Sequence, residues 1–226
     1  MAQSDISGPH FRSPHNVTLL GAGDCDAATL AQCLALAPVL VAADGGASRA
    51  LAADHMPQAV FGDFDSIDAA AKAAIPADRL FPSADQETTD FEKSLAAIAA
   101  PLILATGFLG ARVDHQLAAF NAIARSRAQC ILVGAQDVCF HAQCGRDYLL
   151  PSTPGERVSL FPMQQVRGQS DGLRWPIAGL TFAPAGRIGT SNMATGPMVR
   201  LAFEGGGMIV VMPRHRLADL VGALGG

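Results

Sequence analysis

Short runs of apolar residues recur along the first half of the chain, and glycine and acidic or basic residues follow each of them. Four such runs, at 17–20, 39–43, 59–61 and 102–106, alternate with stretches of helical character. Continuous apolar strands separated by helices are typical of a parallel sheet that is covered on both faces. Ligands of such sheets bind at the carboxyl ends of the strands. The pattern therefore predicts an α/β fold whose binding residues lie in the loops after the strands.

The third apolar run ends at Gly62 and is followed by two carboxylates, Asp63 and Asp65. In an extended chain the side chains at i and i+2 point to the same side, so we expect this pair to hold one hard cation such as magnesium. The plain alternative is a turn in which the carboxylates accept local backbone hydrogen bonds. Three further polar motifs that include acids in the same half of the chain favour the cation site.

The first two runs end in glycine-containing turns. Gly21-Ala22-Gly23 is typical of dinucleotide-binding folds, in which Asp44 would lie near the ribose, but the third glycine is replaced by Asp26. Asp26 is better explained as the N-cap of a helix at 27–36. Asp44-Gly45-Gly46 precedes a second helix, where Asp44 is equally explained as an acid near a helix N-terminus. We therefore keep NAD binding only as an alternative and expect these turns to approach a phosphate group.

The segment from Asp85 to Lys93 contains the start of a helix. Thr89 and Glu92 form a capping box, which also explains part of the role of Asp90 as an acid in the first turn. The box leaves Asp85 and Gln86 unexplained. Because a helix N-terminus offers free N–H groups to phosphate oxygens while its acids can hold the accompanying cation, we expect a phosphate and metal function here.

The fourth run opens into a loop that carries Gly107, Gly110, Arg112, Asp114 and His115 before another helix. Backbone N–H groups, a guanidinium group and a carboxylate are the parts of an anion-binding site. Asp114 is also compatible with a simple N-cap role. His115 is open between a surface residue and a catalytic one.

These four motifs, in this order and spacing, resemble the thiamin pyrophosphokinase family over most of residues 17–125. The resemblance implies transfer of a pyrophosphoryl group from ATP to the hydroxyl of thiamin, with magnesium, giving thiamin diphosphate and AMP. It also implies a Rossmann-like α/β domain, a carboxyl-terminal β-sandwich, and a homodimer with active sites shared between its subunits.

The resemblance assigns roles to individual residues. Those implied in catalysis are Asp63, Asp65 and Asp90, which would hold magnesium, together with Arg112 and Asp114. Those implied in binding the nucleotide are Asp44, which would lie by the nucleotide or the metal, and Gly45, Gly46, Thr89, Lys93, Gly107, Gly110 and His115. Those implied in contacting thiamin are Gln86, Trp175, Ser191 and Asn192. From the residues alone, Trp175 is equally explained as a core residue, and Ser191 and Asn192 as a backbone cap. The spacing around Phe108 and Glu87 departs modestly from the family pattern and weakens the assignment of Gln86.

The second half of the chain has a different character. Short apolar segments punctuated by glycine and proline replace the alternation with helices, which predicts an all-β region. We accordingly expect a flexible arm at 1–15, an α/β catalytic domain at 16–143, and a β-sandwich at 144–226 that contributes to thiamin binding and dimerisation.

Composition narrows the class of partner. The net charge is −4, and no cluster of Lys and Arg marks a nucleic-acid or membrane-surface binder. Half of the 226 residues are hydrophobic, yet the most apolar stretch is too short to span a bilayer and is cut by Pro101. The five cysteines include no C-x-x-C pair, which favours reduced thiols and a cytoplasmic location.

Three other functions stay open. A pyrophosphokinase acting on a hydroxymethyl pterin would share the amino-terminal acids and differ in its acceptor pocket. A nucleotide-sensing module without catalytic activity would not need so many converging acids. An NAD-dependent oxidoreductase is the third, and it depends on the incomplete glycine motif.

Overall fold

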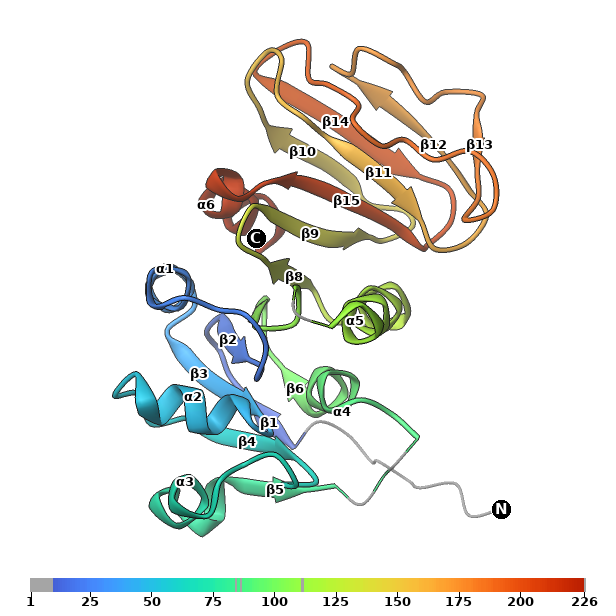
Figure 1. The fold of residues 1–226 in the computed structure, drawn as a ribbon. Helices are drawn as coiled ribbons and strands as arrows, with labels where there is room; N and C mark the ends of the chain where they lie inside the picture. The colour runs from blue at the N-terminus through green and yellow to red at the C-terminus, as the bar shows by residue number, and fades with distance from the viewer. Residues whose placement is uncertain (1–9, 84, 86, 111, 226) are drawn as a thin grey trace.

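A nine-stranded sheet runs through the molecule, and a four-stranded sheet packs against one end of it (Figure 1). The structure is a computed structural model that describes residues 10–83, 85, 87–110 and 112–225. The strand order of the large sheet is β11-β15-β9-β8-β7-β2-β3-β4-β5.

One part of the large sheet is parallel and the other is antiparallel. The parallel strands are β2 (Val17–Leu20), β3 (Val39–Ala43), β4 (Ala59–Gly62), β5 (Leu80–Pro82), β7 (Ile103–Thr106) and β8 (Cys130–Val133). The antiparallel strands are β9 (Asp137–Ala142), β11 (Ser159–Pro162) and β15 (Met208–Pro213). All residues of β2, β3, β4, β7 and β8 are buried, which confirms the α/β architecture predicted from their apolar runs.

Helices cover both faces of the parallel strands (Figure 1). On one face lie α1 (Ala27–Leu36), α2 (Gly46–Ala52) and α3 (Ala69–Ala74), with the short helix η1 (Ala77–Arg79) following α3. On the other face lie α4 (Asp90–Ala97) and α5 (Val113–Arg125). Side chains alternate along a strand, so Leu40 packs with α1 while its neighbour Val41 packs in the same cluster as α4. No helix in the described part of the chain is long and apolar enough to cross a membrane.

Two helix starts follow the predicted caps. The carboxylate of Asp26 accepts a hydrogen bond from the Thr29 N–H at 2.6 Å and begins α1. The hydroxyl of Thr89 accepts one from the Glu92 N–H at 3.2 Å and begins α4. Each bond satisfies one of the N–H groups that have no partner within the helix.

The order of the parallel strands reverses between β2 and β7. From β2 the chain adds β3, β4 and β5 in one direction and then places β7 on the opposite side of β2. The loops that leave β2 and β7 therefore run to helices on opposite faces of the sheet. This topological switch point is where open α/β sheets bind their ligands.

The carboxyl-terminal region forms a second layer. Its strands are β10 (Asp147–Pro151), β14 (Met198–Phe203), β12 (Val166–Asp171) and β13 (Thr181–Phe182), in that order across the sheet. Their buried side chains, including Tyr148 and Leu201, pack against those of β9 and β15, including Phe140 and Val210. One layer of this β-rich region is thus an extension of the α/β sheet, because β9 pairs directly with β8. The division at residues 143 and 144 into separate functional units stays a prediction.

Two features differ from what the sequence suggested. The carboxyl-terminal region is not all-β, because η2 (Arg214–Arg216) leads into helix α6 (Leu217–Leu224), whose Leu217, Leu220 and Leu224 are buried in the main core. The expected arm at 1–15 includes β1 (Phe11–Arg12), which pairs in parallel with β6 (Ile98–Ala99). Phe11 explains this order, since it packs against the cluster that contains Ile98.

We expect only two of the five cysteines to react quickly with a thiol reagent in the native protein. Burial raises the pKa of Cys33 and of Cys139 to about 12, and it raises the pKa of Cys130 as well, so these thiols stay protonated and inaccessible. Cys25 and Cys144 are at least partly exposed. Titration with a chromogenic disulfide at pH 8 should show two fast equivalents and three more after denaturation. Five fast equivalents would contradict this packing.

Candidate active site

The carboxyl ends of β2, β3, β4 and β7 surround a pocket of about 430 Å³ at the switch point. The predicted site residues that line it are Asp44, Gly45, Asp63, Thr89, Asp90, Lys93, Gly107, Gly110, Arg112 and His115. The other lining residues include Ala22 and Gly23 from the loop after β2. All four polar motifs of the first half therefore meet in one place, as expected for the ends of parallel strands.

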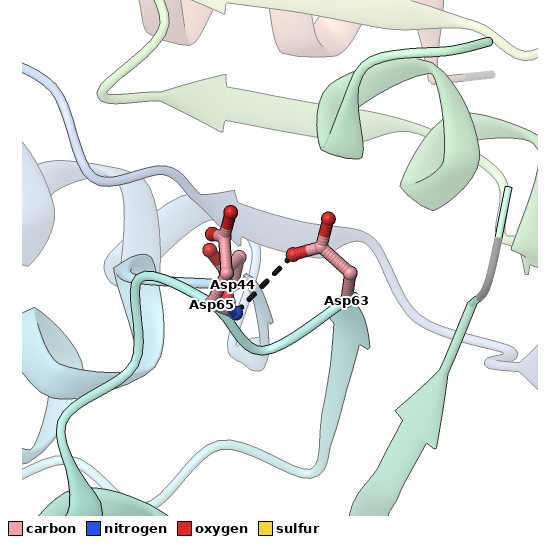
Figure 2. Close-up of side chains that lie close together, drawn as sticks. All are labelled: Asp44, Asp63 and Asp65. Atoms are coloured by element: carbon pink, nitrogen blue, oxygen red, sulfur yellow. Dashed lines mark hydrogen bonds between the residues drawn. The ribbon is translucent and has the colours of Figure 1, made fainter. Parts of the chain in front are cut away.

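Three carboxylates form the acidic side of this pocket region (Figure 2). Asp44, Asp63 and Asp65 each offer an oxygen within 4.8 Å of the others. The extended geometry expected for Asp63 and Asp65 is wrong, because Phe64 between them has φ of 64°, in the left-handed region. The carboxyl of Asp63 instead accepts a hydrogen bond from the Asp65 N–H at 3.2 Å, which closes a tight turn. The two acids are brought together by this turn.

Asp44 is the buried member of the three, with 4% of its surface exposed. Its Oδ2 accepts a hydrogen bond from the Ser66 N–H at 3.1 Å, whereas its buried Oδ1 has no hydrogen-bond partner among the described residues. Burial raises the pKa of the Asp44 carboxyl, the neighbouring charges of Asp90 and Asp65 also raise it, and the bond from Ser66 opposes them. A buried carboxylate oxygen without a donor is an unfavourable arrangement that a cation would relieve.

Gly62 makes this arrangement sterically feasible. Its φ is +153°, and a Cβ at this position would lie 2.8 Å from the Cβ of Asp44. Asp44 itself has φ of 40°, a left-handed conformation that few residues other than glycine adopt. Unfavourable backbone conformations of this kind concentrate at functional sites.

Basic side chains also line the pocket. The ammonium group of Lys93 lies 3.2 Å from the Asp90 carboxylate, and only 8% of the Lys93 side chain is exposed. Arg112, which lines the pocket, makes two hydrogen bonds to Asp114, at 3.2 and 2.7 Å, whereas Asp114 does not line it. The hydrogen bonds from Arg112 hold the pKa of the Asp114 carboxyl below its usual value. The pocket therefore combines carboxylates that suit a cation with basic groups that suit an anion.

The loops after β2 and β7 touch through their backbones. The Gly23 N–H donates to the Gly107 carbonyl at 2.9 Å, and the Gly21 N–H donates to the Thr106 carbonyl at 2.8 Å. A Cβ at Gly23 would lie 2.6 Å from the Gly107 oxygen. This close approach explains why glycine occurs in both loops.

Residues 30–133 match the sequence profile described as "Thiamin pyrophosphokinase, catalytic domain". The matched range contains all four polar motifs that form the pocket. The chain is also 28% identical over 204 residues to "Thiamine pyrophosphokinase 1" of Oryza sativa subsp. japonica, covering 73% of this chain and 75% of that protein. Both comparisons relate this chain to thiamin pyrophosphokinases.

Solved thiamin pyrophosphokinases share the fold. The enzyme from Candida albicans superposes with a TM-score of 0.73 at 16% identity, over 94% of this chain and 95% of that one. The protein from Geobacillus thermodenitrificans gives 0.70 at 20% identity, over 88% and 96%. The yeast enzyme gives 0.70 at 16% identity, over 96% of both chains. At these identities the likeness supports the α/β plus β-rich architecture and not individual site residues.

Several residues that the thiamin pyrophosphokinase resemblance assigned lie outside the pocket. Asp65 belongs to the acid group but not to the pocket lining, and Gly46 lies behind Gly45 at the start of α2. Trp175, Ser191 and Asn192 lie in the carboxyl-terminal region and do not line it. Gln86 falls outside the described residues. Asp90, predicted as a metal ligand, lines the pocket but is not a member of the three-acid group, which Asp44 completes.

The side chain of Asn192 is occupied by its own region. Its Oδ1 accepts hydrogen bonds from the N–H groups of Trp175 and Met193, at 3.2 and 2.8 Å, and its Nδ2 donates to the Trp175 carbonyl at 2.8 Å. Asn192 therefore fixes the backbone that presents Trp175, and 52% of the Trp175 surface is exposed. This is the backbone-cap role that the sequence left open for Asn192.

Three residues with contacts at or near the pocket escaped the assignments made from sequence. Ser66 donates its N–H to Asp44, and the Thr88 hydroxyl donates to the Asp85 carboxylate beside the pocket. Arg49 holds the loop after β2 through backbone carbonyls. The first two lie within the motifs that drew attention to the site, whereas no pattern in the sequence indicated the contacts of Arg49.

Proposed function

We propose that this protein transfers the pyrophosphoryl group of ATP to the hydroxyl of thiamin, giving thiamin diphosphate and AMP. The observation that carries the proposal is one pocket lined by Asp44 and Asp63, two of the three clustered carboxylates, and also by Lys93 and Arg112. A triphosphate with a bound cation has this distribution of charge. The similarity to thiamin pyrophosphokinases supports thiamin as the acceptor.

Magnesium fits the acid group. Carboxylate oxygens are the ligands that magnesium prefers, and the buried Oδ1 of Asp44 has no hydrogen-bond partner among the described residues. We propose that Asp44, Asp63 and Asp65 hold the ion, with Asp90 near enough to contribute. When bound, magnesium supplies positive charge that stabilises the phosphate oxygens during transfer.

The protein's own contribution is positioning and charge. Phosphoryl-type transfer needs little covalent assistance, because the main requirements are neutralised phosphate oxygens and an acceptor hydroxyl in line with the phosphorus. Lys93 and Arg112 would contact phosphate oxygens, and the adjoining glycine loops allow the chain of phosphates to approach the backbone. Asp114 would orient the Arg112 guanidinium group through the two hydrogen bonds between them.

We further propose that the protein is a homodimer in which Trp175 of one subunit completes the acceptor site of the other. The support is that Trp175 is half exposed, carries the Arg174 guanidinium over its ring at 4.9 Å, and does not line the pocket of its own subunit. A flat cationic ring such as thiamin would gain about 0.5–2 kcal/mol by stacking on tryptophan. A two-fold dimer brings the same two surfaces together twice.

The shared site predicts complementation in trans. Mixing inactive Asp65→Asn protein with Trp175→Ala protein should restore activity, because some mixed dimers hold one site without either substitution. Trp175→Ala alone should raise the KM for thiamin more than the KM for ATP. If the subunits demonstrably exchange and the mixture never exceeds the sum of its parts, Trp175 serves its own subunit or none.

The activity itself is tested by incubating the protein with magnesium-ATP and either thiamin or a hydroxymethyl pterin. Thiamin diphosphate and AMP in the first mixture, and no reaction in the second, would support the proposal. AMP formed only in the mixture with the pterin would favour a pyrophosphokinase that acts on a hydroxymethyl pterin. ADP would indicate an ordinary kinase, and unchanged ATP a sensing module. The cytoplasmic location expected from the unpaired cysteines stays a prediction.

A further inference from the structure

Arg49, on the exposed side of α2, contacts the loop that follows β2. Its Nη2 donates to the Cys25 carbonyl at 2.7 Å, and its Nη1 donates to the Ala22 carbonyl at 3.3 Å. One guanidinium group thus joins both ends of the segment from Ala22 to Cys25. Arg49 does not line the pocket itself.

The segment held in this way forms part of the pocket wall. Ala22 and Gly23 line the pocket, and the Gly23 N–H is bonded to the Gly107 carbonyl of the neighbouring loop. The helix that carries Arg49 begins beside Gly45, which also lines the pocket. Arg49 therefore connects the loops that follow β2 and β3, and Gly23 extends the connection to the loop after β7.

The contact also has an electrostatic consequence. A carbonyl oxygen is the negative end of the peptide dipole, so a carbonyl that turned toward a bound polyphosphate would repel it. A guanidinium group that binds two carbonyls fixes their direction and adds positive charge behind the loop. A planar group with several donors suits this better than an ammonium group, which acts as a point charge.

We propose that Arg49 is a positioning residue for the nucleotide, which acts by holding the carbonyls of Ala22 and Cys25 so that the loop after β2 keeps a shape that accepts the phosphate chain. This inference builds on the proposed use of ATP. Arg49 should affect the binding of the nucleotide and should not affect the binding of the acceptor, thiamin.

The test is the steady-state kinetics of Arg49→Ala. The KM for magnesium-ATP should rise roughly tenfold or more, since a small displacement of a positioning group has effects of this order, while the KM for thiamin stays within about twofold. Millimolar guanidinium ion should lower the raised KM by filling the space left by the side chain. Arg49→Lys should give an intermediate KM, because one ammonium group replaces the two-carbonyl contact only in part.

Arg146→Ala is the matched control. Arg146 also binds two backbone carbonyls, those of Ala223 and Leu224 at 3.2 Å each, but at the end of α6 and away from the pocket. This variant should melt at a lower temperature with an unchanged KM for ATP. If the role of Arg49 were purely structural, Arg49→Ala would also melt at a lower temperature and keep an unchanged KM for ATP.

An unchanged KM for ATP in folded Arg49→Ala would overturn the inference. If that variant does not fold, Arg49→Lys decides instead, and a wild-type KM in the folded lysine variant would overturn the inference equally. Absence of thiamin diphosphate formation by the wild-type protein would be a failure of the proposed function. Active wild-type protein with an unaffected Arg49 variant would be a failure of this inference alone.

Discussion

Replacing either Asp63 or Asp65 by asparagine should lower kcat at least about a hundredfold while leaving the fold intact. The change removes one negative charge from a group of three carboxylates whose oxygens lie within 4.8 Å of one another. A hundredfold loss corresponds to about 2.7 kcal/mol of transition-state stabilisation, which is modest for a ligand of a catalytic cation. Turnover at saturating magnesium-ATP and thiamin is the measurement.

The fold should survive because both side chains lie in the turn after β4 and neither is buried. Asp65 is exposed and Asp63 half-buried, and asparagine can accept the same hydrogen bond from the Asp65 N–H. Asp78→Asn is the matched control, since Asp78 is an exposed acid on η1 that does not line the pocket. It should behave as the wild-type protein. Near-normal turnover in Asp63→Asn or Asp65→Asn would contradict the proposed cation site.

Gly46→Ala should destabilise the protein by about 3 kcal/mol or more, which is the upper range for inserting an atom into a packed region. A Cβ at Gly46 would lie 2.1 Å from the carbonyl oxygen of Leu20 and 2.8 Å from its carbon. Both are backbone atoms of a buried central strand, so α2 would have to move away from β2. The free energy of unfolding in urea is the measurement.

Gly222→Ala provides the comparison for this substitution. Gly222 lies within α6, and nothing approaches within 4 Å of a Cβ at this position. Alanine there should raise the free energy of unfolding by about 0.5–1 kcal/mol, because it favours the helix. If Gly46→Ala were as stable as Gly222→Ala, the close packing of α2 on β2 would be wrong.

Strands β2, β3, β4 and β7 could be predicted from sequence because each is buried on both faces and is therefore a continuous apolar run. Strand β12 could not be predicted, because its sequence Val-Arg-Gly-Gln-Ser-Asp has little apolar periodicity. Its place depends on pairing with β14, where Gly168 allows the Phe203 ring to approach. Helix α6 was missed although the spacing of Leu217, Leu220 and Leu224 is helical, because the segment follows a long β-rich region.

In the site, too, features encoded in local sequence could be predicted, whereas contacts between distant residues could not. The acids and glycines after the strands predicted the pocket, because the topology of a parallel sheet brings strand ends together. The left-handed conformation of Phe64 was not predictable from its residue type, which disfavours it. The contacts of Arg49 with Ala22 and Cys25 join residues 27 and 24 positions apart and have no local signature.

The central claim is that the β- and γ-phosphates of ATP move together to thiamin in one step. The most direct test supplies magnesium-ATP that carries radioactive phosphorus in its β-phosphate, with thiamin as acceptor, and follows the label by chromatography. The proposed reaction places the label in thiamin diphosphate and leaves unlabelled AMP. Label that stays with the nucleotide as ADP, while thiamin gains unlabelled phosphate, would contradict pyrophosphoryl transfer.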